Sequence, residues 1–191
     1  ARWALIQAPQ KKVLDADITC VDYLFHLDKK SFAGGVFSSH YWTSLIALLH
    51  EKNMKVNWLH HFVKHHAVPT ASKAEALLSA FNTKAKGWEL HDCFDAGITP
   101  RILGLACRDY IKLRWMHVRL RGVRYHFKLE NSSLDLWPIF RKDWQVSMTG
   151  SSALINCVQL NLYEARCKQL PYQKLGFYLQ ENQPWEMAFI Y

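Results

Sequence analysis

The residues with the clearest potential for chemistry lie near the end of the chain, in the polar segment 179–186 (LQENQPWE). Glu181, Asn182 and Gln183 stand where a predicted strand ends and a predicted helix begins. In open parallel sheets, ligands bind beyond the carboxyl ends of the strands. One carboxylate and two amides at such a position can bind sugar hydroxyls, beside the free N–H groups of the helix N-terminus. The alternative is structural: Glu181 and Asn182 cap the helix, and Glu186 complements its dipole.

A second candidate is a run of positive charge between residues 101 and 128. It contains eight basic residues and one acidic residue, Asp109, and so carries most of the net charge of +8. Four of the basic residues recur at spacings of 7, 4 and 7 and would share one helix face: Arg101, Arg108, Lys112 and Arg119. We expect this face to bind anionic partners such as phosphate-linked lipid acceptors, anionic glycans or an acidic membrane surface. The alternative is a solvated helix face, which is the usual role of a charge run.

A third candidate is the group of four histidines His60, His61, His65 and His66. Imidazoles bind zinc or copper, but a metal site needs three or four converging ligands, and residues 53–71 contain no Cys, Asp or Glu. On a strand, His60 and His61 would point to opposite faces, so they could not easily bind one ion. We therefore predict no metal site, and we expect His65 or His66 to face a polar cleft and bind phosphate or an acceptor sugar.

Other functional signatures are not found in the sequence. It contains no G-x-S-x-G, no Walker phosphate-binding loop and no G-x-G-x-x-G. Aromatic residues alternate with the basic ones in residues 115–127, as in some nucleic-acid-binding proteins. No ribonucleoprotein motif, zinc finger or helix-turn-helix spacing accompanies them. We expect no specific nucleic-acid partner.

The elements that must position these residues follow from hydrophobic periodicity and capping signals. We predict strands at 18–25, 55–62 and 174–179, and a loop over 131–144. Helices are predicted from the cap Ser39 to Asn53, from a capping box at 72–75 to Gly87, over 98–127, from Ser151 or Ser152 to 170–171, and from Pro184 onward. The inner face of the 151–171 helix is predicted at Ile155, Val158, Leu162 and Ala165. Residues 118–128 could form a strand instead of a helix end. Strands alternating with helices predict an α/β fold, with an open, mostly parallel sheet and flanking helices.

Length and composition are those of one globular domain over residues 1–191, with 50% hydrophobic and 21% charged residues. No apolar stretch approaches the roughly 20 residues that a membrane-spanning helix needs. Five scattered cysteines lack metal or disulfide spacing, which favours buried, reduced thiols and a cytoplasmic location. The helix from Pro184 is cut off at Tyr191, so we expect the chain to be a fragment of a longer two-domain protein.

The residues 178–186 (YLQENQPWE) resemble the Tyr-x-x-Glu-Asn-Gln-x-Trp-Glu signature of the bacterial surface-carbohydrate (O-antigen type) biosynthesis family. The segment 38–42 (SSHYW) and the residues Trp144, Ser147 and Gly150 are also similar to that family. The resemblance spans most of the chain, and its specific block is 181–186. It implies a glycosyltransferase of the two-lobed, GT-B type, in which this chain is the Rossmann-like N-terminal lobe that recognises the acceptor.

The resemblance also implies roles for particular residues. Glu181 would be the base that takes a proton from the acceptor hydroxyl, while Asn182 and Gln183 orient sugar hydroxyls. The other substrate-binding candidates are His40, His65, His66, Arg108, Lys112 and Arg119. The substrates would be a nucleotide sugar, held largely by a C-terminal lobe of the same protein, and a glycan or lipid-phosphate acceptor. We expect no cofactor, peripheral contact with the inner membrane, and no activity of the isolated fragment.

The alternative function is a non-catalytic domain that binds anionic polymer or scaffolds an assembly. The two functions predict different structures. A transferase lobe should place Glu181 and Asn182 in a cleft at the carboxyl ends of the strands. A scaffold should present the basic face between Arg108 and Arg124 as its main feature, with Glu181 buried in a helix cap.

Overall fold

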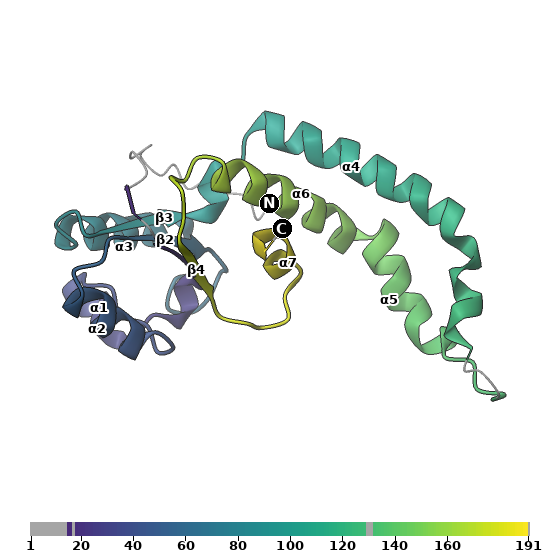
Figure 1. Cartoon of the computed structure of the whole chain (residues 1–191), viewed down its shortest axis with the longest axis horizontal. Helices are drawn as coiled ribbons and strands as arrows, with labels where there is room; N and C mark the ends of the chain where they lie inside the picture. Colours follow the sequence, from purple (N-terminus) through teal and green to yellow (C-terminus); the bar gives the residue numbers. More distant parts are fainter. Residues whose placement is uncertain (1–14, 17, 129–131, 191) are drawn as a thin grey trace. The chain divides into compact units, whose positions relative to one another are not determined.

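The computed structural model describes residues 15–16, 18–128 and 132–190, which form two compact units. Unit 1 comprises the described residues up to Ile98 together with Ala165–Glu186, and unit 2 comprises Thr99–Glu164 and the described residues from Met187 on. Organisation as a single domain stays a prediction. Unit 1 contains β1 (Ile18–Tyr23), the 3₁₀ helix η1 (Leu24–His26), α1 (Lys29–Gly34), α2 (Thr43–Glu51), β2 (Val56–His61), α3 (Ala71–Lys84), β3 (Glu89–Cys93), the 3₁₀ helix η2 (Phe94–Gly97) and β4 (Leu175–Tyr178) (Figure 1).

Unit 1 is built on an open sheet of four parallel strands in the order β3-β2-β1-β4. The register pairs Ile18 of β1 with Val56 of β2 and with Leu175 of β4, and it pairs Val56 with Glu89 of β3. All four strands therefore end at the same edge of the sheet, which we call the carboxyl edge. The predicted α/β class, with a parallel sheet flanked by helices, is confirmed, and the arrangement is Rossmann-like.

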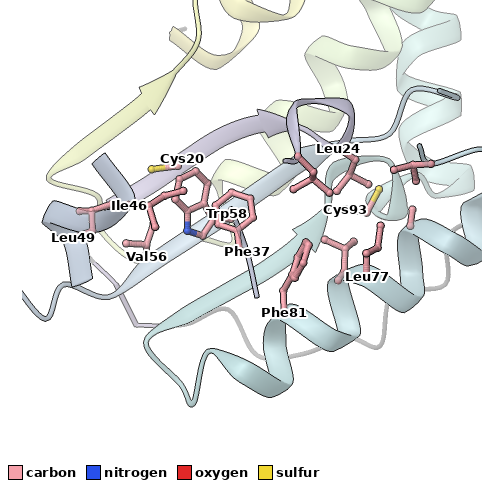
Figure 2. Close-up of a cluster of buried hydrophobic side chains, with 14 of the residues drawn as sticks. Cys20, Leu24, Phe37, Ile46, Leu49, Val56, Trp58, Leu77, Phe81 and Cys93 are labelled. Atoms are coloured by element: carbon pink, nitrogen blue, oxygen red, sulfur yellow. The ribbon is translucent and has the colours of Figure 1, made fainter. Parts of the chain in front are cut away.

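One face of the sheet carries the main hydrophobic core of unit 1, which α2 and α3 cover (Figure 2). Cys20 of β1 and Trp58 of β2 meet Phe37, Leu77 and Phe81 there, and Trp58 has no exposed surface. Truncating a buried aromatic side chain to alanine costs about 3–5 kcal/mol in proteins. This core therefore fixes the strands firmly and, with them, the side chains at both ends of the sheet.

The helix starts in unit 1 differ from two sequence predictions. The cap of α2 is not Ser39, because the helix begins at Thr43 after Trp42. The cap of α3 is Thr70, whose side chain accepts a hydrogen bond from the backbone N–H of Lys73 at 3.2 Å. Thr70 stands two residues before the predicted capping box and satisfies the same kind of free N–H group. Both helices nevertheless lie where the apolar periodicity predicts them.

Unit 2 contains α4 (Pro100–Arg119), the 3₁₀ helix η3 (Leu120–Phe127) and α5 (Trp137–Thr149) (Figure 1). Two further helices, α6 (Ser151–Cys167) and α7 (Pro184–Ile190), each contribute residues to both units. The predicted loop at 131–144 is wrong from Trp137 on, because Pro138 occupies the first turn of α5, where its missing N–H has no partner to lose. Residue 131 lies outside the described residues.

The core of unit 2 is small. Ala106 of α4 packs with Cys157 and Val158 of α6, and the half-buried Tyr110 and Leu113 complete the cluster. The predicted inner face of α6 is correct at Val158 and Leu162 but wrong at Ile155, which is 43% exposed. The strand alternative at 118–128 is also wrong, because η3 occupies this segment.

All five cysteines are free thiols, as their spacing predicts. Cys107 is exposed, so the prediction that the cysteines are buried is wrong at this position. In the part of the chain that the structure describes, no helix is long and apolar enough to cross a membrane.

Candidate functional site

The carboxyl edge of the sheet in unit 1 gathers polar side chains from three segments. β1 ends at Tyr23 and leads into η1, β2 ends at His61, and β4 ends at Tyr178 before the loop that contains Glu181. Because the three strands are parallel and paired, these segments meet at one edge. The arrangement brings together residues as distant in sequence as Tyr23 and Trp185, which are 162 positions apart.

The centre of the cluster is His26, which lies between two carboxylates. Its Nδ1 is 2.8 Å from Asp22 Oδ1, and its Nε2 is 3.2 Å from Glu181 Oε1. The Asp22 side chain has no exposed surface, His26 is 3% exposed, and Glu181 is 28% exposed. Each ring nitrogen therefore faces one carboxylate oxygen, so that Asp22 positions the imidazole and the imidazole positions Glu181.

The loop that carries Glu181 is held in place by Glu186. One carboxylate oxygen of this buried residue accepts hydrogen bonds from the backbone N–H groups of Glu181 and Gln183, at 2.7 and 2.8 Å. Asn182, between them, has a φ of 57°, a conformation that asparagine tolerates better than most residues. Glu186, and not Glu181, therefore performs the capping role, which leaves the Glu181 carboxylate to face His26.

Aromatic rings form the wall behind this cluster. Trp185 donates a hydrogen bond from its indole N–H to the Tyr23 hydroxyl, and its ring centroid lies 4.8 Å from that of His61. The Tyr23 ring lies 5.4 Å from His26. Burial raises the pKa of Tyr23, and burial lowers the pKa of His61 to about 3, so both side chains are neutral at pH 7. These rings make a firm, uncharged support for the His26–carboxylate cluster.

A further carboxyl group, Asp95, follows β3 at the same edge. Its Oδ2 accepts a hydrogen bond from the backbone N–H of Phe62 at 3.1 Å. Burial raises the pKa of Asp95 to about 6, although the hydrogen bond from Phe62 opposes the shift. Asp95 is thus a second acidic group at this edge whose proton is held more tightly than usual.

Chemically, the cluster is suited to accept a proton from a bound hydroxyl group. Glu181 reaches solvent, and one of its oxygens contacts His26 while the other makes no hydrogen bond to a described residue. The buried carboxylate of Asp22 fixes the imidazole, the imidazole fixes the Glu181 carboxylate, and a carboxylate of fixed orientation can act as a base. Among the described residues, no group of three or more His, Cys, Asp or Glu could hold a metal ion.

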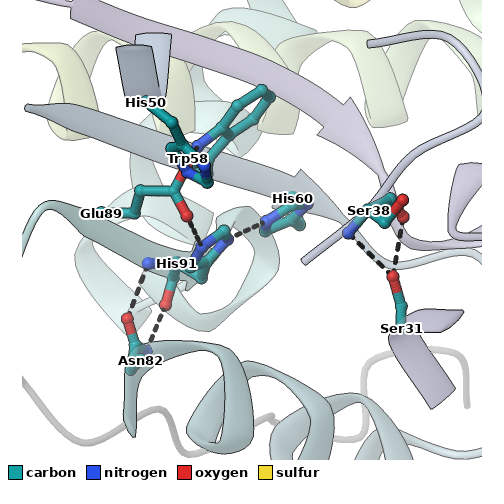
Figure 3. Close-up of polar contacts among 8 residues, drawn as sticks. All are labelled: Ser31, Ser38, His50, Trp58, His60, Asn82, Glu89 and His91. Atoms are coloured by element: carbon teal, nitrogen blue, oxygen red, sulfur yellow. Dashed lines mark hydrogen bonds and ion pairs between the residues drawn. The ribbon is translucent and has the colours of Figure 1, made fainter. Parts of the chain in front are cut away.

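The structure brings several of the predicted site residues to the cluster. Glu181 lies in it, and the exposed Asn182 and Gln183 follow directly. The backbone N–H of His40 donates to the backbone oxygen of His26 at 3.0 Å, which places His40 at the same edge. The segment around His40 is fastened by hydrogen bonds between Ser31 and Ser38, at 2.7 and 2.9 Å (Figure 3).

The predicted histidine loop also lies near the edge. The half-buried His65 has its ring centroid 5.9 Å from that of Phe25, the neighbour of His26, and the ring of the exposed His66 packs against His65 at a tilt, with the centroids 3.9 Å apart. As predicted, His60 and His61 point to opposite faces of the sheet: His61 contacts Tyr23 and Trp185, whereas His60 contacts Phe37 in the core. His65 and His66 are therefore placed where a ligand at the edge could reach them.

The basic candidates belong to a different unit. Arg108, Lys112 and Arg119 lie on α4 in unit 2 and are exposed. Arg108 and Lys112 pair with Asp109 at 3.0 and 3.8 Å, and the guanidinium of Arg119 stacks on the Trp115 ring at 4.4 Å. Each of the three cations thus has a contact within α4, and all three still reach solvent.

Unit 2 contains a basic cavity that the sequence did not indicate. It has a volume of about 800 Å³ and is formed by residues of α4, η3 and α5. Its cations are Arg121, Arg124, Lys128 and Arg141, and its aromatic walls are Tyr125, Trp137 and Trp144. The carboxylate in its lining, Asp135, accepts a hydrogen bond from the backbone N–H of Trp137 at 2.9 Å. Three of the four cations come from the basic run, and Arg141 comes from the helix that was predicted as a loop.

The sequence analysis did not identify Asp22 and His26 as candidate site residues. Their signal was a charged residue inside an otherwise apolar strand, ITCVDY, followed four residues later by a histidine. A buried aspartate needs a partner, and a histidine just beyond the strand end is a natural one. Their contact with Glu181 depends on the pairing of β1 with β4, which the sequence alone does not reveal.

A second polar array begins at the opposite edge of the sheet, where β3 starts (Figure 3). His60 Nε2 lies 3.0 Å from His91 Nδ1, His91 Nε2 lies 3.3 Å from Glu89 Oε2, and Glu89 Oε1 lies 3.0 Å from His50 Nε2. Burial opposes the ionisation of Glu89, but hydrogen bonds and charge from His91 and His50 outweigh it and lower its pKa. Burial lowers the pKa of both His60 and His91. His50, 52% exposed, is the solvent-facing end of this array.

Glu89 and His50 line a cavity of about 370 Å³ at this amino edge, together with Lys84 and Lys86.

The fold and the two arrays define the molecule as a parallel α/β protein with polar sites at both ends of its sheet. Comparisons of the chain with protein-family models, curated proteins and solved structures find no match. The resemblance to the surface-carbohydrate biosynthesis family therefore stays a prediction.

Proposed function

We propose that unit 1 is the acceptor-side lobe of a two-lobed glycosyltransferase that acts in bacterial surface-polysaccharide (lipopolysaccharide and O-antigen) synthesis. The observation that carries the proposal is the contact of Glu181 with His26 at the carboxyl edge of a parallel sheet, with buried Asp22 behind the imidazole. A base of fixed orientation at this edge is what sugar transfer requires. The sequence block 181–186 supplies the sugar-polymer context of the proposal.

In the proposed reaction, Glu181 takes the proton of the acceptor hydroxyl as that oxygen attacks the anomeric carbon of the donor. The bond from this carbon to the nucleotide diphosphate breaks, and the diphosphate leaves with the electron pair. His26 holds the carboxylate in position and stabilises it through the contact at 3.2 Å. The exposed Asn182 and Gln183, with His40, His65 and His66, would contact the hydroxyls or phosphate of the acceptor.

The remaining parts of the proposal concern partners. A C-terminal lobe of the same protein would hold the nucleotide sugar, and the acceptor would be a glycan or a lipid phosphate. The exposed cations of unit 2, including Arg108, Lys112 and Arg119, would favour an anionic lipid surface, so we place the reaction at the cytoplasmic side of the inner membrane.

The test is to measure sugar transfer by the full-length protein from nucleotide sugars to lipid-phosphate acceptors. Replacing Glu181→Gln should lower kcat by about 10²–10⁴-fold, because the amide cannot accept the proton. The matched control is Glu51→Gln, which removes a carboxylate that is 70% exposed and pairs with Lys52 in α2. If Glu181→Gln transfers sugar as fast as Glu51→Gln and the unmodified protein, Glu181 is not the base.

A second function, binding of an anionic polymer without catalysis, is favoured by the basic cavity of unit 2 alone. No carboxylate forms an ion pair with Arg121, Arg124, Lys128 or Arg141 among the described residues, so these cations are available for phosphate groups. Polyphosphate is a suitable probe, and Trp137 and Trp144 report its binding by fluorescence. The double variant Arg121→Gln/Arg141→Gln should bind about tenfold more weakly, a loss of about 1.4 kcal/mol.

The charge-matched control for this cavity is Arg108→Gln/Lys112→Gln, which removes two cations that pair with Asp109 outside it. Equal weakening in both double variants would show only a general effect of net charge and would argue against a site. Glu181→Gln should leave polyphosphate binding unchanged. The two candidate functions can therefore be tested independently.

A further inference from the structure

The two polar arrays of unit 1 each end in a buried atom that has no hydrogen-bond partner among the described residues. One is Oδ2 of Asp22, whose other oxygen binds His26, and the other is Nδ1 of His60, whose Nε2 binds His91. Asp22 is 1% exposed and His60 has no exposed surface, so bulk solvent does not reach either atom. Unpartnered buried polar groups of this kind are rare in proteins and require a physical explanation.

The fold places these two residues side by side. Asp22 of β1 and His60 of β2 are register partners in the parallel sheet, where neighbouring strands run about 4.8 Å apart. Cys20 and Trp58, the partners two residues earlier, both belong to the core on one face, and side chains repeat their direction every two residues. Asp22 and His60 therefore project from the same face of adjacent strands.

The hydrogen bonds of the second array determine what the free atom of His60 can do. The ionised Glu89 accepts a hydrogen from His91 Nε2, which leaves His91 Nδ1 as an acceptor for the hydrogen on His60 Nε2. Burial lowers the pKa of His60 well below its usual value, so the ring is neutral and its Nδ1 is a lone pair. The Oδ2 atom of Asp22 is also an acceptor. Two neighbouring acceptors cannot satisfy each other, whereas one water molecule donates two hydrogens.

We propose that a buried water molecule binds between Asp22 Oδ2 and His60 Nδ1 and joins the two arrays into one hydrogen-bonded chain across the sheet. The chain runs from Glu181 through His26 and Asp22 to the water, and then through His60, His91 and Glu89 to His50. It begins at the carboxyl edge and ends at a half-exposed imidazole at the amino edge.

The consequence is that the hydrogen bonds at the two ends of the sheet are linked. The charged groups facing His26 are Asp22 and Glu181, next to the rings of Tyr23 and Tyr41, and those around His50 are Glu89 and the cavity lysines Lys84 and Lys86. A change in the hydrogen bond between His50 and Glu89 alters the polarisation of each member in turn. The water site and the linkage do not depend on the function proposed for Glu181.

The linkage is measurable in the 191-residue chain by nitrogen NMR of its histidines, without an activity assay. His60 should carry its hydrogen on Nε2 from pH 5 to pH 9; a hydrogen on Nδ1 would overturn the proposal. The variant His50→Gln should change the ring-nitrogen chemical shifts of His26 at constant pH, because it alters the hydrogen bond to Glu89 at the far end of the chain of hydrogen bonds. The control His66→Gln, which removes an exposed imidazole outside both arrays, should leave the chemical shifts of His26 in place.

The decisive comparison repeats His50→Gln in a His60→Phe background. Phenylalanine preserves a flat ring of similar size but cannot bind the water or His91, so the effect of His50→Gln on His26 should disappear. The same shift in both backgrounds would mean that the ends interact only through space, and the chain would be ruled out.

A second measurement needs no variant, so it remains informative if His60→Phe does not fold. A high-resolution crystal structure should show one water molecule within hydrogen-bond distance of both Asp22 Oδ2 and His60 Nδ1. A direct contact of the two side chains, or another protein group bound to either atom, would refute the water site.

Discussion

The two ends of the sheet in unit 1 use the same residue types in different surroundings. At the carboxyl edge, His26 lies between two carboxylates, and one of these, Glu181, is 28% exposed. At the amino edge, Glu89 is 6% exposed and receives hydrogen bonds from His91 and from His50. In the first array the histidine is central and a carboxylate reaches solvent. In the second the carboxylate is central and a histidine reaches solvent.

This difference separates a group that can react from one that stabilises the fold. A carboxylate with a solvent-facing side can meet a substrate, and its loss removes few buried contacts. A buried carboxylate with several donors is costly to alter, because each donor loses a charged partner in a poorly solvated place. The comparison therefore predicts that equivalent substitutions at the two edges affect different properties of the protein.

The largest effect should appear at low pH, where the carboxyl edge loses the contribution of His61 to the free energy of unfolding. Its pKa is about 3 in the folded protein and near 6.5 when unfolded, so its contribution to stability is complete above pH 6.5 and is lost as the pH falls toward 3. At pH 4.5 this loss is about 3 kcal/mol. His61→Phe keeps a ring between Phe94 and Trp185 and should abolish this loss of stability. Denaturant unfolding at pH 7.5 and 4.5 measures the difference.

The control for His61 is His66→Gln, because it also removes an imidazole, but an exposed one. This variant should show the same acid dependence of stability as the unmodified protein. If His61→Phe loses as much stability between pH 7.5 and 4.5 as the unmodified protein does, another group is responsible for the acid sensitivity.

The next largest effect tests the comparison of the carboxylates directly. Glu89→Gln should lower the free energy of unfolding at pH 7 by about 2 kcal/mol, because an amide replaces the charged acceptor of His91 and His50. Glu181→Gln should change it by less than about 0.5 kcal/mol, since this side chain is partly solvated. Urea unfolding of both variants gives the two values. Equal losses would mean that both carboxylates serve mainly to stabilise the fold.

Most of the fold was predictable because local patterns and tertiary packing agree in β1, β2, α3 and β4. β3 was missed for a specific reason. Its sequence ELHDC contains three ionisable residues among five, and strands usually avoid them. In the structure His91 is buried with Glu89 as its partner, and Asp92 pairs with Arg166, so contacts distant in sequence make these residues acceptable in a strand. No local pattern reports such contacts.

The candidate site was only partly predictable for the same reason. Glu181 could be placed at a strand end from the sequence, because the strand and the following helix both have clear local signals. Its partners could not, since the contact with His26 requires knowing that β4 pairs with β1. Glu186 lies in the first turn of α7, as its predicted dipole role requires, but its hydrogen bonds were not predicted. A carboxylate in the first turn of a helix usually faces solvent, but here it turns back to bind the loop that carries Glu181.

The smallest predicted effect compares the backbone strain at the two edges of the sheet. Lys86 lies beside the amino-edge cavity with a φ of 48°, and Asn182 lies in the Glu181 loop with a φ of 57°. This left-handed conformation costs most residues about 1 kcal/mol, whereas asparagine adopts it more readily and glycine freely. Lys86→Gly should therefore raise the free energy of unfolding by about 0.5 kcal/mol, after the greater freedom of glycine in the unfolded chain is subtracted. Asn182→Gly should change it by less, and a gain at Asn182 that exceeds the gain at Lys86 would show that the Glu181 loop is the more strained of the two.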